Sequence, residues 1–362
     1  MQIEELDTPA VLIDLDVLEG NVRRMAERAA ACGVALRPHG KTHKLIEVAR
    51  LQRDAGARGM TLAKLGEAEA FAAAGFDDIF VAYPVVGALK ARRALVLARR
   101  VRLAVGVDSP EGALTLSAVF AEGGNSLDVL LKVDVGYHRV GVPPEHALET
   151  AIRIAELPGL RLRGIFTHAG QGYAAETPTA VQAAGHVEGA TLAQTAEELR
   201  RAGLAIEVVS VGSTPTAPHA MGMAGVTECR PGNYVYHDAS QVSLGTCGLE
   251  DCALTVLATV VSTPAPERAV LDAGSKTLSS DPLRPRPGGF GLLLGTRSRL
   301  DRLSEEHGVV GVDAADRFRV GQRVRVLPNH SCVVSNLHDR VFAVRGDRVE
   351  AVWTIAARGR VQ

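Results

Sequence analysis

The chain has 362 residues, of which 46% are hydrophobic, and its 40 basic and 41 acidic residues leave a formal net charge of −1. This length suits two domains or one large barrel with an addition, and the evenly spread charge argues against nucleic acid or a membrane surface as a partner. No apolar run has the length of a membrane span, no signal peptide is recognisable, and the five scattered cysteines are typical of reduced thiols, so we expect a cytoplasmic protein.

Short apolar segments alternate with helical stretches over the first two thirds of the chain. A strand at 10–15 and a helix at 16–32 come first, and helical stretches at 66–75, 110–121, 144–155 and 180–202 separate later strands. Eight further strands are expected at 34–40, 59–63, 78–83, 102–107, 128–135, 160–168, 207–213 and 225–230. This alternation predicts parallel βαβ units and an α/β fold built on a TIM-type (β/α)8 barrel. An open doubly wound sheet is the alternative, but no Gly-x-Gly-x-x-Gly motif follows the first strand.

The pattern changes at about residue 239, where valine-rich segments separated by turn residues replace the helical periodicity. These segments are 253–261, 268–271, 308–312, 322–327, 340–344 and 349–356, and the proline-rich stretch 281–290 is expected to be a loop. We therefore predict a barrel domain at 11–238 and a second, antiparallel β-domain at 239–362, which also includes residues 1–10.

Lys41 lies in a cationic segment at the exit of the first barrel strand. Arg37 and Lys44 flank it, together with the imidazoles of His39 and His43. A second positive charge nearby lowers the pKa of an amine, because the two cations repel one another. An amine with a lowered pKa can act as a nucleophile and form a Schiff base. The alternatives are a solvated basic turn and a patch that binds an anion.

Glycine and hydroxyl residues follow the last two strands of the predicted barrel. Gly212, Ser213 and Thr214 come after the seventh strand, and Gly232 and Asn233 come after the eighth. Their backbone N–H and hydroxyl groups can donate to a phosphate, and barrels favour these two loops for phosphate sites. Each loop alone is typical of an ordinary turn. Their placement at the same barrel face as the strand-end lysine predicts a phosphorylated cofactor.

His330 and Cys332 form a second candidate site in the β-domain. Residues two apart in a strand project from the same face, so the imidazole and the thiolate can meet. This pair suits zinc or a similar borderline metal, with the remaining positions open to water and substrate. The alternative is a buried cysteine beside a hydrogen-bonded histidine. Residues 336–339 (Asn-Leu-His-Asp) follow closely and can add a ligand or a supporting partner.

Four segments of the chain match one known family. They are residues 8–15 (Thr-Pro-Ala-Val-Leu-Ile-Asp-Leu), 37–44 (Arg-Pro-His-Gly-Lys-Thr-His-Lys), 230–234 (Arg-Pro-Gly-Asn-Tyr) and 328–332 (Pro-Asn-His-Ser-Cys). Together they resemble the metal-activated pyridoxal-phosphate (PLP) enzymes of the D-threonine aldolase and D-serine dehydratase group. The resemblance extends from Leu6 to Arg358 and implies the alanine-racemase-like fold, fold type III. It also implies PLP, a divalent metal (zinc, manganese or magnesium) and a homodimer.

The resemblance implies a role for each candidate residue. Lys41 would hold PLP and His168 would pack against its ring, and these two are the candidate catalytic residues. Arg139 would bond the phenolic oxygen of PLP, and Arg230 would lie near the ring nitrogen, where it disfavours the pyridinium form. His330 and Cys332 would hold the metal. The residues expected to cradle the phosphate are Gly212, Ser213, Thr214, Gly232 and Asn233, with help from Tyr173.

The resemblance further implies a lyase that acts on β-hydroxy D-amino acids. We expect a D-threonine aldolase, which gives glycine and acetaldehyde, with a D-serine or 3-hydroxy-D-aspartate dehydratase as the alternative. Cys332 favours the dehydratase, since the aldolases have an aspartate there, whereas residues 336–339 favour the aldolase. An amino-acid racemase would need a tyrosine from the β-domain, which has none after Tyr236. A non-catalytic PLP-carrying protein would lack a β-domain altogether.

Overall fold

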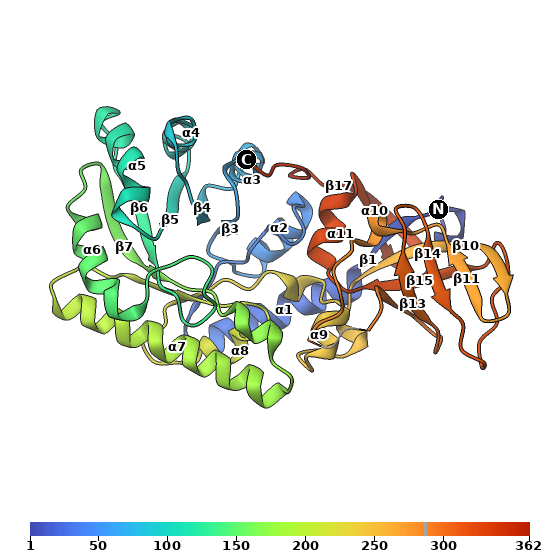
Figure 1. Cartoon of the computed structure of the whole chain (residues 1–362). Coiled ribbons are helices and arrows are strands. Elements are labelled where there is room, and N and C mark those ends of the chain that lie inside the picture. The colour runs from blue at the N-terminus through green and yellow to red at the C-terminus, as the bar shows by residue number, and fades with distance from the viewer. Residues whose placement is uncertain (286–287) are drawn as a thin grey trace.

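A parallel eight-stranded sheet surrounded by helices forms the first domain, and a nine-stranded sheet forms the second (Figure 1). This computed structural model describes residues 1–285 and 288–362. The strand order in the first domain is β2-β9-β8-β7-β6-β5-β4-β3, so each neighbour along the chain pairs in parallel from β3 to β9. The predicted combination of a TIM-type barrel and an antiparallel β-domain is therefore confirmed.

The elements of the barrel follow the predicted alternation. Its strands are β2 (Ala35–Leu36), β3 (Met60–Leu62), β4 (Asp78–Pro84), β5 (Arg102–Val107), β6 (Leu127–Lys132), β7 (Leu160–Phe166), β8 (Val208–Val211) and β9 (Glu228–Cys229). Its helices are α1 (Leu15–Ala31), α2 (Ile46–Asp54), α3 (Leu65–Ala73), α4 (Ala88–Ala98), α5 (Pro110–Glu122), α6 (Ala147–Ala155), α7 (Pro178–Arg201) and α8 (Ala217–Ala220). Short 3-10 helices lie at Ile3–Glu5, Pro144–His146, Gly170–Ala174, Asn233–Val235 and Leu249–Asp251.

Capping residues define where several barrel helices begin. The Asp14 carboxylate accepts from the backbone N–H groups of Asp16 and Val17 at the start of α1. Ser109 and Thr177 cap α5 and α7 in the same way, and each is followed by a proline at the first helical position. A side-chain acceptor satisfies an otherwise unpaired N–H, and proline has the backbone angle that a helix start requires. The sequence thus encodes these boundaries locally.

The barrel closes next to Lys41. Its edge strands β2 and β3 are short, and a parallel bridge between His39 and Thr61 joins them. The strand predicted at 34–40 ends at Leu36, because the backbone from His39 onward turns: Gly40 N–H donates to Thr61 O, and Lys44 N–H donates to Gly40 O. The cationic segment is therefore a turn fixed by backbone hydrogen bonds at the seam of the barrel.

The second domain contains a closed antiparallel barrel of six strands with a three-strand extension. Its strands are β10 (Leu254–Ala265), β11 (Arg268–Leu271), β12 (Gly291–Leu293), β13 (Arg299–Leu303), β14 (Gly308–Gly311), β15 (Arg323–Pro328), β1 (Ala10–Asp14), β16 (Arg340–Arg345) and β17 (Arg348–Thr354). Pairing of β10 with both β11 and β15 closes the six strands, and β1, β16 and β17 extend the sheet beyond β10. Helices α9 (Ala239–Ser243), α10 (Ser275–Leu278) and α11 (Ser331–Leu337) accompany it.

Three features of this domain differ from the prediction. Strand β1 was expected in the barrel, but it pairs antiparallel with β10 and parallel with β16, which satisfies its backbone on both sides. Strands β12 and β13 were not predicted, because they are short and rich in glycine or arginine. Helix α11 was not predicted either. The proline-rich stretch 281–290 forms no regular element among its described residues, and residues 286–287 lie outside the described part.

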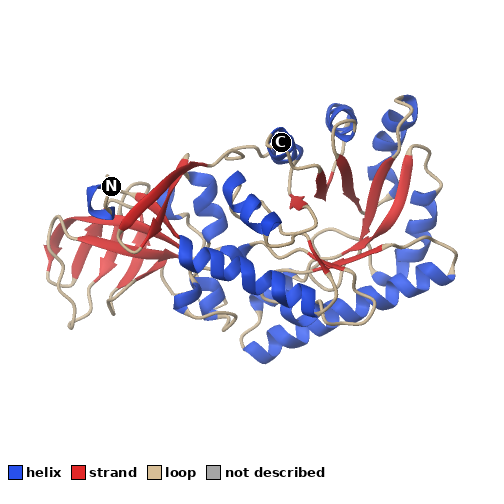
Figure 2. Cartoon of the chain, turned by 180° about the vertical axis from the view of Figure 1, so that it is seen from behind, coloured by secondary structure: helices blue, strands red, loops and turns tan. Residues whose placement is uncertain are grey.

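The two domains contact each other well beyond the segment of chain that connects them. One hydrophobic cluster extends from barrel residues such as Phe71 to second-domain residues such as Val326. The end of the chain also returns to the barrel, where Gly66 N–H at the start of α3 donates to Gln362 O, and the C-terminus lies beside α3 (Figure 1). The view from behind shows the helices gathered around the barrel strands and the second sheet standing to one side (Figure 2). In the described part of the chain, no helix combines the length and the apolar character that crossing a bilayer requires.

Candidate active site

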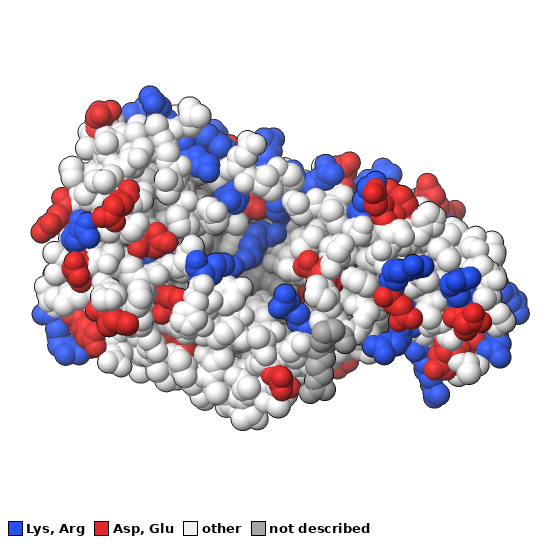
Figure 3. Space-filling view, in the orientation of Figure 1, with Lys and Arg blue, Asp and Glu red and all other residues white. Residues whose placement is uncertain are grey.

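A cavity of about 580 Å³ lies at the carboxyl ends of the barrel strands, where the second domain meets the barrel. The surface is hollowed between the two domains, with lysine and arginine side chains inside and around the hollow (Figure 3). The predicted site residues that line the cavity are Lys41, His168, Tyr173, Gly212, Ser213, Thr214, Arg230, Gly232, Asn233, His330 and Cys332. Residues from positions 41 to 332 therefore meet in one space.

Lys41 faces this cavity without a protein partner for its amine among the described residues. Burial lowers its pKa, and the positive charges of Arg139 and Arg230 act in the same direction, while Cys332 and Glu67 oppose them. Desolvation and like charge both disfavour the ammonium form. The amine is thus prepared for attack on a carbonyl group. The direction of the shift is the predicted one, but its causes are burial, Arg139 and Arg230, whereas Arg37 and Lys44 form ion pairs with carboxylates.

His168 follows strand β7 and forms one wall of the cavity. Its Nδ1 lies 3.4 Å from Gly212 O, and its ring meets Tyr137 edge-on at 5.7 Å between centroids. Burial lowers the pKa of His168 well below its usual value, and Lys41 and Lys132 add to this effect. A neutral, flat ring in a partly apolar wall is suited to packing against an aromatic ligand.

The loops after β8 and β9 provide a hydroxyl donor, Thr214, and a close backbone approach. The Thr214 hydroxyl oxygen accepts from Tyr234 N–H at 3.1 Å, which leaves its proton free for a ligand. A Cβ on Gly232 would lie 2.7 Å from Thr42 Oγ1, so that position requires glycine. Gly212 has φ +118°, which also favours glycine, but its N–H donates to Glu188. Gly212 thus contributes the shape of the cradle, and its own N–H is not free for a phosphate.

The side chain of Asn233 has a different role from the predicted one in phosphate binding. Its side-chain amide donates to Asp238 Oδ2 at 2.6 Å and to Ser331 Oγ at 2.9 Å, and it lies 3.7 Å from Cys332 Sγ. These contacts leave only the backbone N–H of Asn233 for a phosphate. The side chain instead connects the barrel loop to helix α11, which carries the predicted metal pair.

Arg139 is the predicted site residue that does not line the cavity. Its side chain is exposed, and its guanidinium lies over the Tyr137 ring, 4.8 Å from the centroid. Tyr137 itself lines the cavity. The loop after β6 therefore turns Arg139 outward, although its charge still acts on Lys41 and His168.

His330 and Cys332 come together, but not as neighbours on a strand. Strand β15 ends at Pro328, His330 is the capping residue of α11, and Cys332 lies in the first turn of that helix. The strand interpretation was wrong, because the chain turns into a helix at His330. The turn nevertheless places the imidazole and the thiol within hydrogen-bonding reach of each other.

The surroundings of this pair suit a metal. Burial opposes the shift, but Cys332 and Asp281 raise the pKa of His330 to about 11, and His330 in turn lowers the pKa of Cys332. Asp281 Oδ2 lies 2.6 Å from His330 Nδ1. At this pKa the ring also carries a proton on Nε2, so a metal would displace that proton while Nδ1–H stays bonded to the carboxylate. The described residues hold no cluster of three or more metal-ligating side chains, so water or substrate would complete the coordination.

Buried charged residues around the site were missed, among them Asp238, which lines the cavity, and Lys132 and Glu188, which lie behind it. Burial and the charge of Arg230 lower the pKa of Lys132, at the end of β6, to about 7. Glu188 of α7 accepts hydrogen bonds from Ala169 N, Gly212 N and Thr216 Oγ1, and so joins the loops after β7 and β8. Glu188 lies on the apolar face of α7, next to Gly189. A charged residue on an otherwise apolar face is the feature of the sequence that could have identified it.

Comparison with known proteins agrees with this geometry. The model of the alanine racemase N-terminal domain matches residues 13–240, and the model of a putative serine dehydratase domain matches residues 253–344. This chain belongs to the alanine-racemase-like family. The resemblance drawn from the four sequence segments is thus confirmed.

The relatives of this alanine-racemase-like chain include dehydratases and aldolases of hydroxy amino acids. It is 41% identical to a D-threo-3-hydroxyaspartate dehydratase from Delftia sp., over 99% of this chain and 96% of the relative. It is 34% identical to a D-threonine aldolase from Arthrobacter sp., over 99% and 94%. A solved D-threo-3-hydroxyaspartate dehydratase, a cysteine-to-alanine variant in the metal-free form, has a TM-score of 0.91 at 39% identity and 98% coverage of both chains. A histidine-to-alanine variant has a TM-score of 0.92 at 38% identity, with 98% and 96% coverage. The expected enzyme class, a PLP-dependent lyase, is therefore confirmed.

Proposed function

We propose that this enzyme is a PLP- and divalent-metal-dependent dehydratase of β-hydroxy D-amino acids, with 3-hydroxy-D-aspartate as its first candidate substrate. The observation that carries the proposal is that Lys41 of the barrel and the pair His330 and Cys332 of the second domain line one cavity. An amine nucleophile and a metal pair can thus act on the same small molecule.

The residues present fit PLP. Lys41 has a free amine, His168 offers a flat neutral wall, and Gly232 leaves room where any side chain would clash. Thr214 would donate to the phosphate, and Arg230 would face the ring. Ser213 would shape the loop, since its N–H and its hydroxyl both donate to Thr216 Oγ1, whose own proton goes to Glu188. Burial raises the pKa of Tyr173, so its hydroxyl keeps a proton to donate. When bound, PLP supplies an electron sink for negative charge at the substrate Cα.

Different residues of this chain would have different roles in the dehydration. The lowered pKa of Lys41 allows its amine to accept the substrate Cα proton as a general base. The ammonium group that results can then act as a general acid. His330 and Cys332 would hold a divalent metal such as zinc, manganese or magnesium, which supplies Lewis-acid stabilisation of a departing hydroxyl. Loss of water and later hydrolysis convert 3-hydroxy-D-aspartate into oxaloacetate and ammonia, so that the atoms balance.

Two observations reverse the order of aldolase and dehydratase expected from the sequence. Residues 336–339, which favoured the aldolase, do not line the cavity: Asn336 binds Lys44 at 2.7 Å, and His338 Nε2 lies 3.1 Å from Thr277 O. The relative at 41% identity is a dehydratase. In the solved variants of a D-threo-3-hydroxyaspartate dehydratase, the replaced histidine and cysteine are two positions apart, which is the spacing of His330 and Cys332.

An arginine at the cavity supports a substrate with a second carboxylate. Arg284 is exposed and lines the cavity beside Asp281, whose pKa its charge helps to lower, and no hydrogen bond with a described residue holds its guanidinium. A guanidinium is well suited to a carboxylate, which it can bind through two parallel hydrogen bonds. D-Serine and D-threonine have no second carboxylate, whereas 3-hydroxy-D-aspartate has one. We therefore place the dicarboxylic substrate first.

The test is an identification of products. Holoenzyme loaded with PLP and metal is incubated separately with D-threo-3-hydroxyaspartate, D-serine and D-threonine. Oxaloacetate and ammonia from the first substrate, without glycine, is the expected result. Glycine with glyoxylate from 3-hydroxyaspartate, or with acetaldehyde from D-threonine, would instead establish the aldolase. Pyruvate from D-serine at a higher kcat/KM than oxaloacetate formation would overturn the choice of substrate.

A further inference from the structure

We infer that Glu228 and Ser210 are positioning residues for Arg230, and that they hold its guanidinium in place from inside the barrel. Arg230 lines the floor of the cavity, whereas Ser210 and Glu228 lie behind it and do not line the cavity. The inference rests on PLP binding and does not depend on the choice between dehydratase and aldolase.

The three side chains form a continuous buried connection. Arg230 Nε donates to Ser210 Oγ at 2.7 Å, and Ser210 Oγ donates to Glu228 Oε1 at 2.7 Å. Arg230, Ser210 and Glu228 are 4%, 0% and 5% exposed, so water does not compete for these contacts. The Arg230 guanidinium also donates through Nη2 to Thr167 O and lies over the Phe166 ring, 5.2 Å from the centroid.

Chemistry fixes the direction of each hydrogen bond. A guanidinium only donates, so Ser210 Oγ must accept from Arg230. The hydroxyl has one proton, and the remaining partner is the Glu228 carboxylate, which therefore receives it. Ser210 thus transmits the negative charge of Glu228 to Arg230. Replacement of Ser210 by a residue without a hydroxyl breaks the connection at a single point.

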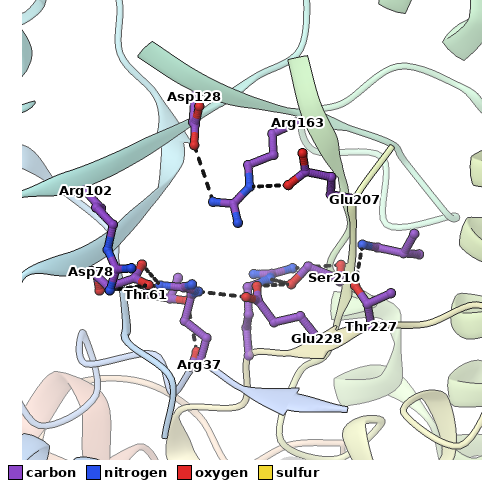
Figure 4. Close-up of polar contacts among 12 residues, drawn as sticks. Arg37, Thr61, Asp78, Arg102, Asp128, Arg163, Glu207, Ser210, Thr227 and Glu228 are labelled. Carbon is purple, nitrogen blue, oxygen red and sulfur yellow. Dashed lines mark hydrogen bonds and ion pairs between the residues drawn. The ribbon is translucent and has the colours of Figure 1, made fainter. Parts of the chain in front are cut away.

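Glu228 is in turn anchored at the amino-terminal mouth of the barrel. Arg37 Nε donates to Glu228 Oε2 at 2.7 Å, and Arg37 Nη1 donates to Asp78 Oδ1 at 2.5 Å. Figure 4 shows Glu228 between Ser210 on one side and Arg37 on the other, with Asp78 beyond Arg37. Both oxygens of Glu228 are therefore engaged, and the carboxylate cannot rotate away from Ser210.

This connection affects the one edge of Arg230 that is left for a ligand. Nε and Nη2 are occupied, and Nη1 has no partner among the described residues. Burial lowers the pKa of Arg230, whereas Glu228 and Glu188 oppose this and keep the proton on the guanidinium. Since Nη1 can only donate, it requires an acceptor such as an unprotonated ring nitrogen. Ser210 and Glu228 thereby determine how firmly that acceptor is held.

The experiment uses four variants of the PLP-loaded enzyme. Ser210→Ala removes the connection, and Glu228→Gln keeps its size but removes the charge. Ser117→Ala is the matched control for the hydroxyl, because the buried Ser117 of α5 bonds Pro158 O far from the cavity lining. Asp128→Asn is the matched control for the carboxylate, because Asp128 pairs with Arg163 at the same barrel mouth (Figure 4). Asp128 also pairs with Arg161. The measurements are the visible absorption of bound PLP as a function of pH, kcat and KM.

We expect Ser210→Ala and Glu228→Gln to shift the absorption band or the pH at which it changes, and to lower kcat about tenfold with KM changed less than threefold. Ser117→Ala and Asp128→Asn should keep the wild-type band. A wild-type band and kcat in Ser210→Ala or in Glu228→Gln would overturn the inference, as would equal spectral shifts in the two controls. If Ser210→Ala does not fold, Glu228→Gln and its control decide alone. An unchanged product pattern alongside a shifted band separates this result from a failure of the proposed function.

Discussion

The thiol of Cys332 lies 3.3 Å from the hydroxyl of Thr42, the residue that follows Lys41. One partner belongs to helix α11 of the second domain and the other to the turn at the seam of the barrel. The two predicted chemical sites therefore share one contact across the domain boundary. A substrate bound beside Lys41 would lie within reach of a metal at Cys332, which neither domain could achieve alone.

Replacement of Lys41 tests the cofactor assignment. We expect Lys41→Ala to abolish the visible absorption band of bound PLP and to lower activity by about a thousandfold or more, because no other lysine lines the cavity in the described part of the chain. Absorption spectroscopy after removal of free PLP is the measurement. Lys64→Ala is the control, since Lys64 lies over the Tyr83 ring and not in the cavity lining. A wild-type band in Lys41→Ala would refute the assignment.

Metal removal tests the pair in the second domain. Chelation should remove activity while PLP stays bound, because the metal ligands and Lys41 are separate groups. Cys332→Ser should lower the metal content, since a hydroxyl replaces the thiolate, and should lower kcat/KM at least tenfold. Metal analysis, absorption and activity are measured together. Cys32→Ser serves as the control, because Cys32 is an exposed thiol outside the cavity. Full activity after exhaustive chelation contradicts the metal role.

Replacement of Arg284 tests the substrate class. Arg284→Gln should raise KM for 3-hydroxy-D-aspartate about fivefold to tenfold, since an exposed charged hydrogen bond is lost, and should leave KM for D-serine within twofold. Steady-state kinetics on both substrates measure the difference. Arg302→Gln, on an exposed position of strand β13, controls for the loss of a positive charge in the same domain. Equal changes for both substrates would argue against recognition of a second carboxylate.

Stability should fall in mild acid because of buried neutral histidines. Burial lowers the pKa of His43 and of His237 to about 4, and an unfolded histidine titrates near 6.5. The folded state binds fewer protons between these values, so the stability that each group contributes is complete above about pH 6.5 and is lost as the pH falls towards 4. One such group corresponds to about 2 kcal/mol between pH 7 and pH 4.5.

His237→Asn provides the variant for this test. His237 has φ +50°, a conformation that asparagine tolerates, and the substitution removes the titrating group. The free energy of unfolding, from urea denaturation at pH 7 and pH 4.5, should decrease less in the variant than in the wild type. An identical decrease in the two proteins would show that His237 does not bind a proton on unfolding.

Local sequence signals predicted most of the fold because they act over a few residues. The alternating strands and helices, with capping residues such as Ser109 and Thr177, could be predicted from the sequence. Short elements without a periodic pattern, such as β12 and β13, could not be predicted. Strand β1 was misplaced because its apolar pattern suits either sheet, and only its pairing with β10 and β16 decides.

The sequence by itself determined the chemistry of the site: a lysine among cations, hydroxyl loops after two strands, and a histidine and a cysteine two residues apart. Only the tertiary structure decided how those groups are arranged. It turned Arg139 outward, engaged the Asn233 side chain with α11, and brought Glu188 and Glu228 beneath the cavity. The physical reason is that buried charges require partners, and those partners lie on elements that are distant in sequence. Lys41 is identifiable from eight residues, but the groups that orient its surroundings become visible only when the barrel closes.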